Sequence, residues 1–130
     1  MVGLLNGSGI AAFADKSGFE IEASWFDAVV VISVSGALDL RTSPELTAAV
    51  ELAANMAPTA VIVDLTGVDF LASTGMNVLV AAHRDITPAT GFGVVAHGPV
   101  TRRPLVLLGL DKLIALYPTR DAALQSLGET

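Results

Sequence analysis

The sequence predicts a single α/β domain with a mixed, mostly parallel β-sheet, an antiparallel hairpin at its N-terminal end and about four helices. Short runs rich in Val and Ile alternate along the chain with segments of helical pattern, which is the order of strands joined by crossover helices. The length of 130 residues suits one domain and is too short for two. Hydrophobic residues make up 52% of the chain and charged residues 15%, so we expect a large aliphatic core.

The first two strands are predicted over residues 19–26 and 28–36. Apolar residues alternate with polar or small ones in the first, as in a half-buried strand, and the second is rich in β-branched residues. The short gap between them predicts an antiparallel hairpin. Because Asn-Gly-Ser-Gly at 6–9 breaks the apolar start of the chain, residues 1–18 are expected to form a loose N-terminal arm before a domain over 19–130.

A first helix is predicted over residues 43–56. Thr42 or Ser43 is placed to cap it, and Pro44 falls in its first turn. Glu45 lies near the positive end of the helix dipole. All of these residue types favour a helix start at this point.

A buried strand and a second helix follow. The run AVIVDLTG predicts a strand over about residues 60–66. Residues 68–72 are expected to form a loop, and Ser73 is the predicted N-cap of a helix over 73–86 that ends before Pro88.

The rest of the chain continues the alternation. We expect, in order, a strand over 91–97, a short helix over 101–110, a strand over 113–118 and a helix over 119–128. Pro104 falls in the first turn of the short helix, and Thr119 is placed to cap the last helix.

Strands joined by crossover helices run parallel, so their carboxyl ends meet at one edge of the sheet. Sites in such folds usually form at that edge. In this sequence the edge is expected to gather Asp39, Ser73, Thr74 and the stretch Gly-Pro-Val-Thr before Arg102.

Composition excludes several classes of function. The net charge of −6 would repel a nucleic acid or an anionic membrane surface, so no nucleic-acid partner is expected. The absence of cysteine excludes disulfides and thiolate metal sites. No uninterrupted apolar run reaches the roughly 20 residues of a membrane span, so we expect no membrane insertion. A chain without cysteine is compatible with a reducing cytoplasm, and we expect a cytoplasmic protein.

Enzymatic chemistry finds little support in the residues. The chain has two histidines, His83 and His97, and the stretch LASTG lacks the glycine two residues before its serine that marks a nucleophile elbow. The sequence contains neither a His-x-x-x-His pair nor a tight carboxylate cluster, so it predicts no metal site. It also lacks the glycine-rich loop followed by a lysine that binds phosphate. We therefore expect neither an enzyme nor a cofactor.

Four stretches, in register, resemble one family. They are VISVSGALDL, TSPELTAAV, VIVDLTGVDFLASTGMNVLVAAHRD and RRPLVLLGLDKLIALYPTRDAAL, and together they cover about residues 20 to 127. The sequence resembles STAS domains, and within them the bacterial anti-sigma factor antagonists. The resemblance implies a STAS-like single domain and a regulatory role in transcription.

In the antagonist branch the motif is Asp-Ser-(Ser/Thr)-Gly, and an anti-sigma factor that is itself a serine kinase phosphorylates its first serine. Aligned on Gly75, that serine is Ser73, which is favoured as the acceptor over Thr74, and the family's aspartate falls on Ala72. The aspartate of the family's Gly-x-Leu-Asp motif matches Asp39. The resemblance implies that the unphosphorylated protein binds the anti-sigma factor and frees a sigma factor, and that a serine phosphatase is a further partner.

The surface that would meet this partner is expected to comprise Asp39, Leu40, Arg41, Leu71, Ala72, Ser73, Thr74, Gly75 and Met76. Ala72 departs from the family motif, which has an aspartate at this position, and the change removes a charge beside the acceptor. An alternative function therefore stays open, in which the domain is not phosphorylated. It would then be a STAS binding module for a small ligand or nucleotide, or an accessory subunit of a transporter or signalling complex.

Overall fold

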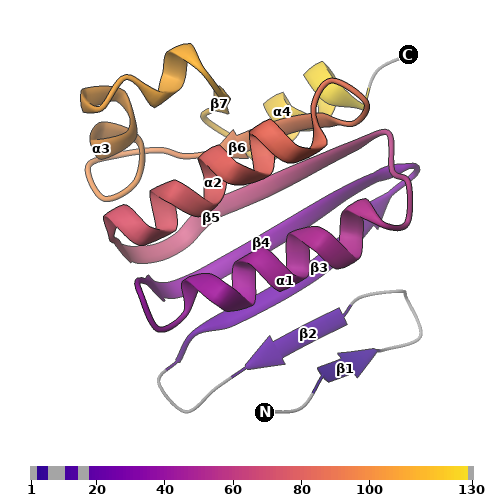
Figure 1. Cartoon of the computed structure of the whole chain (residues 1–130), viewed down its shortest axis with the longest axis horizontal. Coiled ribbons are helices and arrows are strands. Elements are labelled where there is room, and N and C mark those ends of the chain that lie inside the picture. Colours follow the sequence, from indigo (N-terminus) through magenta and orange to yellow (C-terminus); the bar gives the residue numbers. More distant parts are fainter. Residues whose placement is uncertain (1–2, 6–10, 15–17, 129–130) are drawn as a thin grey trace.

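The computed structural model describes residues 3–5, 11–14 and 18–128, the first two segments by their backbone alone. Seven strands form one sheet in the order of the sequence, β1-β2-β3-β4-β5-β6-β7 (Figure 1). The strands are β1 (Gly3–Leu5), β2 (Ala11–Ala14), β3 (Glu20–Phe26), β4 (Val29–Leu38), β5 (Ala60–Leu71), β6 (Gly91–Val95) and β7 (Ala115–Tyr117). The helices are α1 (Ser43–Ala54), α2 (Ser73–Ile86), α3 (Arg102–Leu107), the 3₁₀ turn η1 (Leu110–Lys112) and α4 (Arg120–Leu127).

The sheet is mixed, as the sequence predicts. Strands β1 to β4 pair antiparallel, whereas β4, β5, β6 and β7 pair parallel. The predicted hairpin is formed by β3 and β4, in which Phe26 pairs with Val29. The α/β fold class is thereby confirmed.

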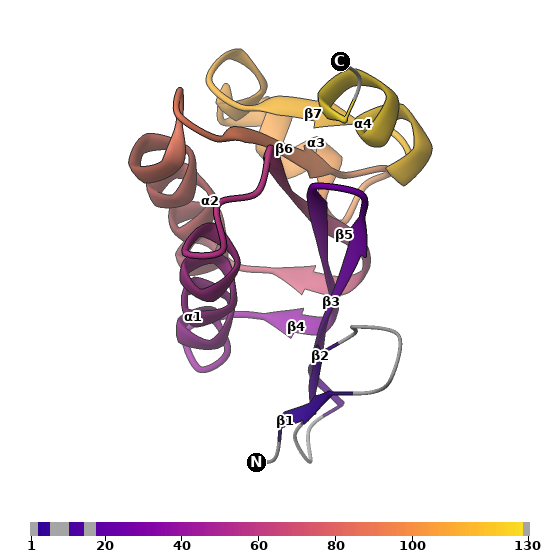
Figure 2. The same cartoon turned by 90° about the vertical axis from the view of Figure 1, so that its right-hand side faces the viewer.

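Helices α1 and α2 cover one face of the sheet, and α4 covers the other (Figure 2). Strand β4 serves both faces because successive side chains of a strand point to opposite sides. Val30, Ile32 and Val34 belong to the larger core, which includes residues of α1 and α2. Val29 and Val31 belong to the smaller core, which includes Ala123 of α4.

The N-terminal arm predicted over residues 1–18 differs in part from this structure. Within it, β1 and β2 extend the sheet beyond β3, and the remaining residues up to 17 lie outside the described part of the chain. A β3 edge presents unpaired backbone N–H and C=O groups, which an added strand satisfies. Short apolar runs without a clear alternation gave no strand signal in the sequence.

Strand β5 is longer than the predicted range of 60–66. After irregularities in the pairing, Gly36 pairs with Val68 and Leu38 with Leu71, so the expected loop at 68–72 is largely strand. Gly67, just after the predicted strand, is a point of close approach, because a Cβ there would lie 2.8 Å from the Cβ of Ser35.

The helices agree with the sequence more closely. Helix α2 has the predicted bounds, and α1 ends at Ala54, two residues before the predicted end. The short helix predicted over 101–110 divides into α3 and η1, with Gly109 in the left-handed conformation between them. Thr119 caps α4 as predicted, since its hydroxyl accepts a hydrogen bond from the N–H of Ala122 at 3.0 Å.

Candidate functional site

The candidate site lies at the carboxyl ends of β4 and β5. Leu38 and Leu71 form the last pair of these strands, and the N–H of Ala72 donates to the carbonyl of Leu38 at 2.9 Å. Asp39 directly follows the first strand, and Ser73 begins the helix after the second. The fold therefore brings the two sequence motifs together at one edge, as predicted, beside the starts of α1 and α2 (Figure 1).

The loop from β4 to α1 is held by its own polar groups. The hydroxyl of Thr42 donates to the carbonyl of Ala37 at 2.7 Å and accepts from the N–H of Asp39 at 2.9 Å. The hydroxyl of Ser43 donates to the carbonyl of Asp39 at 2.6 Å. Neither hydroxyl caps α1, so that prediction is wrong: both groups bond back to the strand end and the loop instead of to the first helical N–H groups.

The carboxylate of Asp39 organises the same loop. Its Oδ1 accepts from the N–H of Arg41 at 3.0 Å and from the N–H of Thr42 at 3.2 Å. Desolvation alone would raise the pKa of Asp39, but the hydrogen bonds from Thr42 and Arg41, together with the Arg41 charge, lower it below its ordinary value. Asp39 therefore stays ionised at neutral pH and keeps the loop in one conformation.

Helix α2 begins without a capping side chain. Ala72 occupies the N-cap position with extended backbone (φ −87°, ψ 165°), and its carbonyl accepts from the N–H groups of Gly75 and Met76 at 3.0 and 3.1 Å. Ser73 is the first helical residue, so the prediction that it caps the helix is wrong by one position. The cause is the length of β5, which carries extended backbone up to the residue before Ser73.

The two adjacent hydroxyls have different surroundings. The side chain of Ser73 is exposed. The Oγ1 atom of Thr74 is buried and has no hydrogen-bond partner among the described residues. The hydroxyl of Ser73 is therefore open to solvent, whereas that of Thr74 would reach the surface only after its side chain had moved.

Gly75 is required by the approach of α2 to β4. A Cβ at this position would lie 2.8 Å from Cγ of Leu38 and 3.1 Å from the carbonyl oxygen of Leu38. Glycine allows the start of α2 to pack directly on the end of β4. The glycine of the motif thus has a packing role that holds Ser73 beside the Asp39 loop.

The apolar residues predicted for partner contact divide into two groups. Leu71 and Met76 are buried in the core, so they offer little surface to a partner. Leu40, in contrast, is 76% exposed at the tip of the β4–α1 loop. Phe70 is 55% exposed one residue before the end of β5, and it was missed because residues 68–72 were assigned to a loop. Asp69 and Phe70 are exposed in succession, so this part of β5 does not show the alternation of buried and exposed residues that marks a strand in the sequence.

The histidines do not join this site. His83 follows Ser73 by ten residues along α2, and the centre of its ring is 6.2 Å from the centre of the Phe92 ring. His97 is exposed after β6. Among residues 18–128 no hydrogen bond links Ser73 to a histidine, and the described residues contain no group of His, Asp and Glu able to hold a metal.

Comparison with known proteins assigns the family. The STAS domain model matches residues 20–123. The chain belongs to the STAS domain family. The anti-sigma-F factor antagonist RsfB of Mycobacterium tuberculosis is 44% identical to this STAS domain over 96 residues, which cover 74% of this chain and 79% of RsfB.

Solved structures agree in fold. The crystal structure of an anti-sigma factor antagonist from Mycobacterium paratuberculosis has a TM-score of 0.79 and 40% identity, and the match covers 97% of this chain and all of that chain. The unphosphorylated form of the anti-sigma factor antagonist SpoIIAA has a TM-score of 0.70 at 19% identity, over 85% of this chain and 97% of that chain, and so shows the fold alone. None of the described helices is long and apolar enough to cross a membrane.

Proposed function

We propose that this STAS domain is an anti-sigma factor antagonist whose unphosphorylated form binds an anti-sigma factor of the serine kinase type and thereby frees a sigma factor. Phosphorylation of Ser73 switches the binding off. The observation that carries this proposal is the exposed hydroxyl of Ser73 at the start of α2, beside the Asp39 loop, next to a Thr74 hydroxyl that is buried. The names of the relatives at 44% and 40% identity support the antagonist role.

The start of α2 suits a phosphate without a change of fold. No hydrogen bond of the N–H groups of Ser73 and Thr74 is recorded within the described residues, and the helix dipole is positive at this end. A phosphoserine carries about −1.5 to −2 charges at neutral pH. The added charge is therefore stabilised within the molecule.

A bound partner would meet that same charge at its interface. Like-charge juxtaposition across an interface costs several kcal/mol, and about 1.4 kcal/mol changes an affinity tenfold. Leu40, at the tip of the β4–α1 loop, and Phe70, one residue before the end of β5, are exposed on either side of the acceptor and supply apolar contact area. Phosphorylation can thus weaken binding strongly while leaving the core unchanged.

The experiment is intact mass spectrometry after incubation with ATP and each anti-sigma factor kinase encoded in the same genome. We expect one added phosphate in the wild type and in Thr74→Ala, and none in Ser73→Ala. A phosphate that persists in Ser73→Ala would refute the assignment of the acceptor. A serine phosphatase that removes the phosphate from the purified phosphoprotein would complete the cycle.

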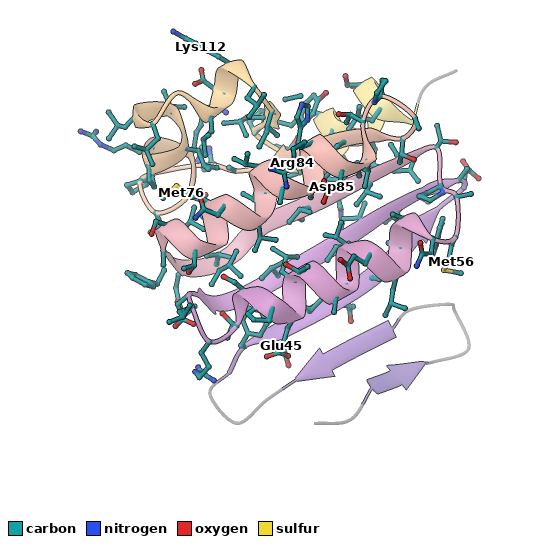
Figure 3. The ribbon with its side chains drawn as sticks, in the orientation of Figure 1. Glu45, Met56, Met76, Arg84, Asp85 and Lys112 are labelled. Carbon is teal, nitrogen blue, oxygen red and sulfur yellow. The ribbon has the colours of Figure 1, made fainter. Side chains whose placement is uncertain are left out.

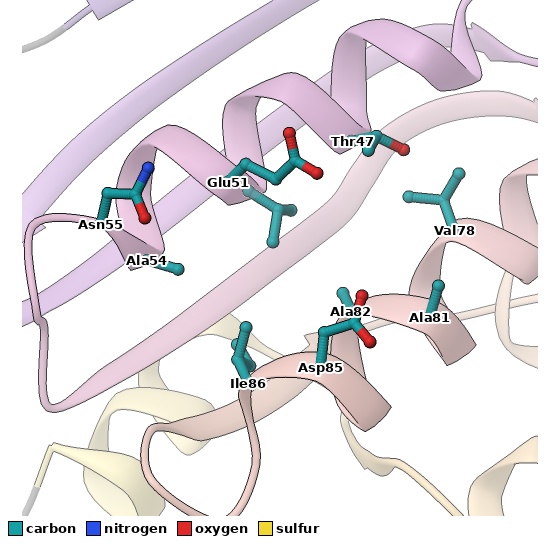
Figure 4. A pocket seen from close by; sticks show the side chains of 10 residues that line it. Thr47, Glu51, Ala54, Asn55, Val78, Ala81, Ala82, Asp85 and Ile86 are labelled. Carbon is teal, nitrogen blue, oxygen red and sulfur yellow. The ribbon is translucent and has the colours of Figure 1, made fainter.

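A second candidate function is a STAS binding module without phosphorylation, and a groove between α1 and α2 favours it. The groove has a volume of about 430 Å³, within the range of small-molecule sites, and small or apolar residues such as Ala54, Ala81 and Val78 line it (Figure 4). Glu51 and Asp85 also line it from the two helices. These carboxylates disfavour a nucleotide and favour a neutral or cationic ligand, which mass spectrometry of the native protein would detect.

A further inference from the structure

The C-terminal part of the domain exposes an apolar surface that the proposed switch does not use. Leu107 is 71% exposed at the end of α3, and Leu108 is 64% exposed in the turn that follows. Val100, Val106 and Leu113 are also exposed. We call these five residues the α3 patch. Val106 and Leu107 line one hollow, and exposed apolar residues that lie together mark an interaction site more often than isolated ones do.

An open hollow lies beside this patch. It has a volume of about 550 Å³ and is lined by Gly98, Pro99, Arg102, Arg103, Val106 and Leu107. The volume is ample for one large side chain of a partner and part of its backbone. Gly98 has a positive φ of 87°, and a Cβ there would meet no atom within 4 Å. The space beside Gly98 in the hollow is therefore empty of protein atoms.

The surroundings of the hollow are basic in an otherwise acidic protein. Residues 98–113 contain Arg102, Arg103 and Lys112 against one acid, Asp111, whereas the whole chain has a net charge of −6. Figure 3 shows Lys112 extending away from the ribbon. The Nη1 atom of Arg102 is buried and has no hydrogen-bond partner in the described part of the chain. A buried donor of a charged group that is left unpaired is costly, and a carboxylate is the acceptor that pairs best with a guanidinium.

The α3 patch lies on the same edge of the domain as Ser73. The loop from β6 to α3 leaves the carboxyl end of a strand parallel to β4 and β5, and α3 stands at the edge where α1 and α2 begin (Figures 1 and 2). A protein bound over Ser73 can therefore extend to α3.

We propose that the α3 patch and its hollow form a second contact for the same protein partner, which inserts a large apolar side chain into the hollow and places a carboxylate against Arg102 and Arg103. This inference rests on the proposed function for the identity of the partner. A partner segment with an apolar residue and an acidic residue about one helical turn apart fits both features. A membrane surface fits less well, because the rest of the chain repels anionic lipid.

The test measures, by calorimetry, the affinity of unphosphorylated protein for the anti-sigma factor that phosphorylates it. We expect Leu107→Asp and Arg103→Glu each to weaken binding at least tenfold while Ser73 is still phosphorylated to completion at high kinase concentration. Leu52→Asp is the matched control, because Leu52 is 60% exposed on α1, away from the hollow, and its binding should equal that of the wild type. Wild-type affinity in both α3 variants would overturn the inference and leave the proposed function intact.

A second arm does not depend on the anti-sigma factor. An NMR titration uses a helical peptide with leucine and glutamate four residues apart, and shifts centred on residues 98–108 that Leu107→Asp abolishes are expected. If the wild type binds no anti-sigma factor but shows these shifts, the proposed function fails, and with it the identity of the partner, while the α3 site for a segment with an apolar and an acidic residue stands. Absence of shifts, or binding to anionic vesicles that Leu107→Asp abolishes, would overturn the inference.

Discussion

The uncapped start of α2 makes a quantitative prediction for Ala72. Replacing Ala72 by Asp restores the residue type that the family motif has at this position, on extended backbone that suits an N-cap. The new carboxylate can accept from the N–H of Thr74, for which no other hydrogen bond is recorded within the described residues. An Asp or Ser in place of Ala at an N-cap stabilises a protein by about 1 kcal/mol, within a range of roughly 0.5–2.

The assay is urea unfolding of the unphosphorylated protein, followed by circular dichroism. In a thermal unfolding experiment, the same gain of about 1 kcal/mol would appear as a rise in Tm of about 3–5 °C for a domain of this size. Ala72→Ser is the matched variant that adds a cap without a charge, and it separates capping from repulsion by the neighbouring Asp39. The same reasoning predicts that Ser73→Ala leaves stability nearly unchanged, because the hydroxyl of Ser73 makes no cap.

Two results would refute this account of the helix start. If neither Ala72→Ser nor Ala72→Asp raises the free energy of unfolding, α2 gains nothing from a cap at residue 72. If Ser73→Ala loses about 1 kcal/mol, Ser73 is the cap after all.

Three further predictions follow from the same site. Gly75→Ala should destabilise the domain by about 1–3 kcal/mol in urea unfolding, because its Cβ would lie 2.8 Å from Cγ of Leu38, and a change below 0.5 kcal/mol would show that α2 can move away from β4. Thr74→Val should be neutral or stabilise by up to about 1 kcal/mol, because it removes a buried hydroxyl that has no recorded partner, and a loss of more than 1 kcal/mol would mean that this hydroxyl does have one. Because the pKa of Asp39 is lowered in the folded state, its contribution to stability should be present above about pH 4 and be lost as the pH falls through the folded pKa. Thermal unfolding between pH 2 and 7 should therefore show the wild type more stable than Asp39→Asn at neutral pH, with the difference vanishing in acid, and a difference independent of pH would contradict the assigned cause.

The sequence was a good guide wherever one residue type has one common use. The bounds of α2 were predicted because residues 73–86 are bracketed by small and hydroxyl residues on one side and by Pro88 on the other. The neighbourhood of Asp39 and Ser73 followed from the rule that parallel strands end at one edge, and it is confirmed by the pairing of Leu38 with Leu71.

The sequence was a poor guide where a residue had several uses. Thr42 has the chemistry of a cap, but its hydroxyl bonds to the strand end at Ala37, which lies five positions earlier. Gly67 is typical of a turn but here permits two strands to approach. Because residues 68–72 were expected to form a loop, the sequence did not predict Phe70 as one of the large apolar side chains exposed at the site. Such choices depend on tertiary neighbours that no short stretch of sequence records.

The way in which the β4–α1 loop is built separates two properties that evolution can change independently. Asp39 and Thr42 bond to each other and to the strand end, so they fix the base of the loop, whereas Leu40 at its tip is 76% exposed. A substitution at the tip alters the surface offered to a partner without disturbing the position of the neighbouring Ser73. Under the proposed function, a cell with several such domains could therefore keep its signalling pathways separate by varying the loop tips while every copy keeps the same phosphorylation site.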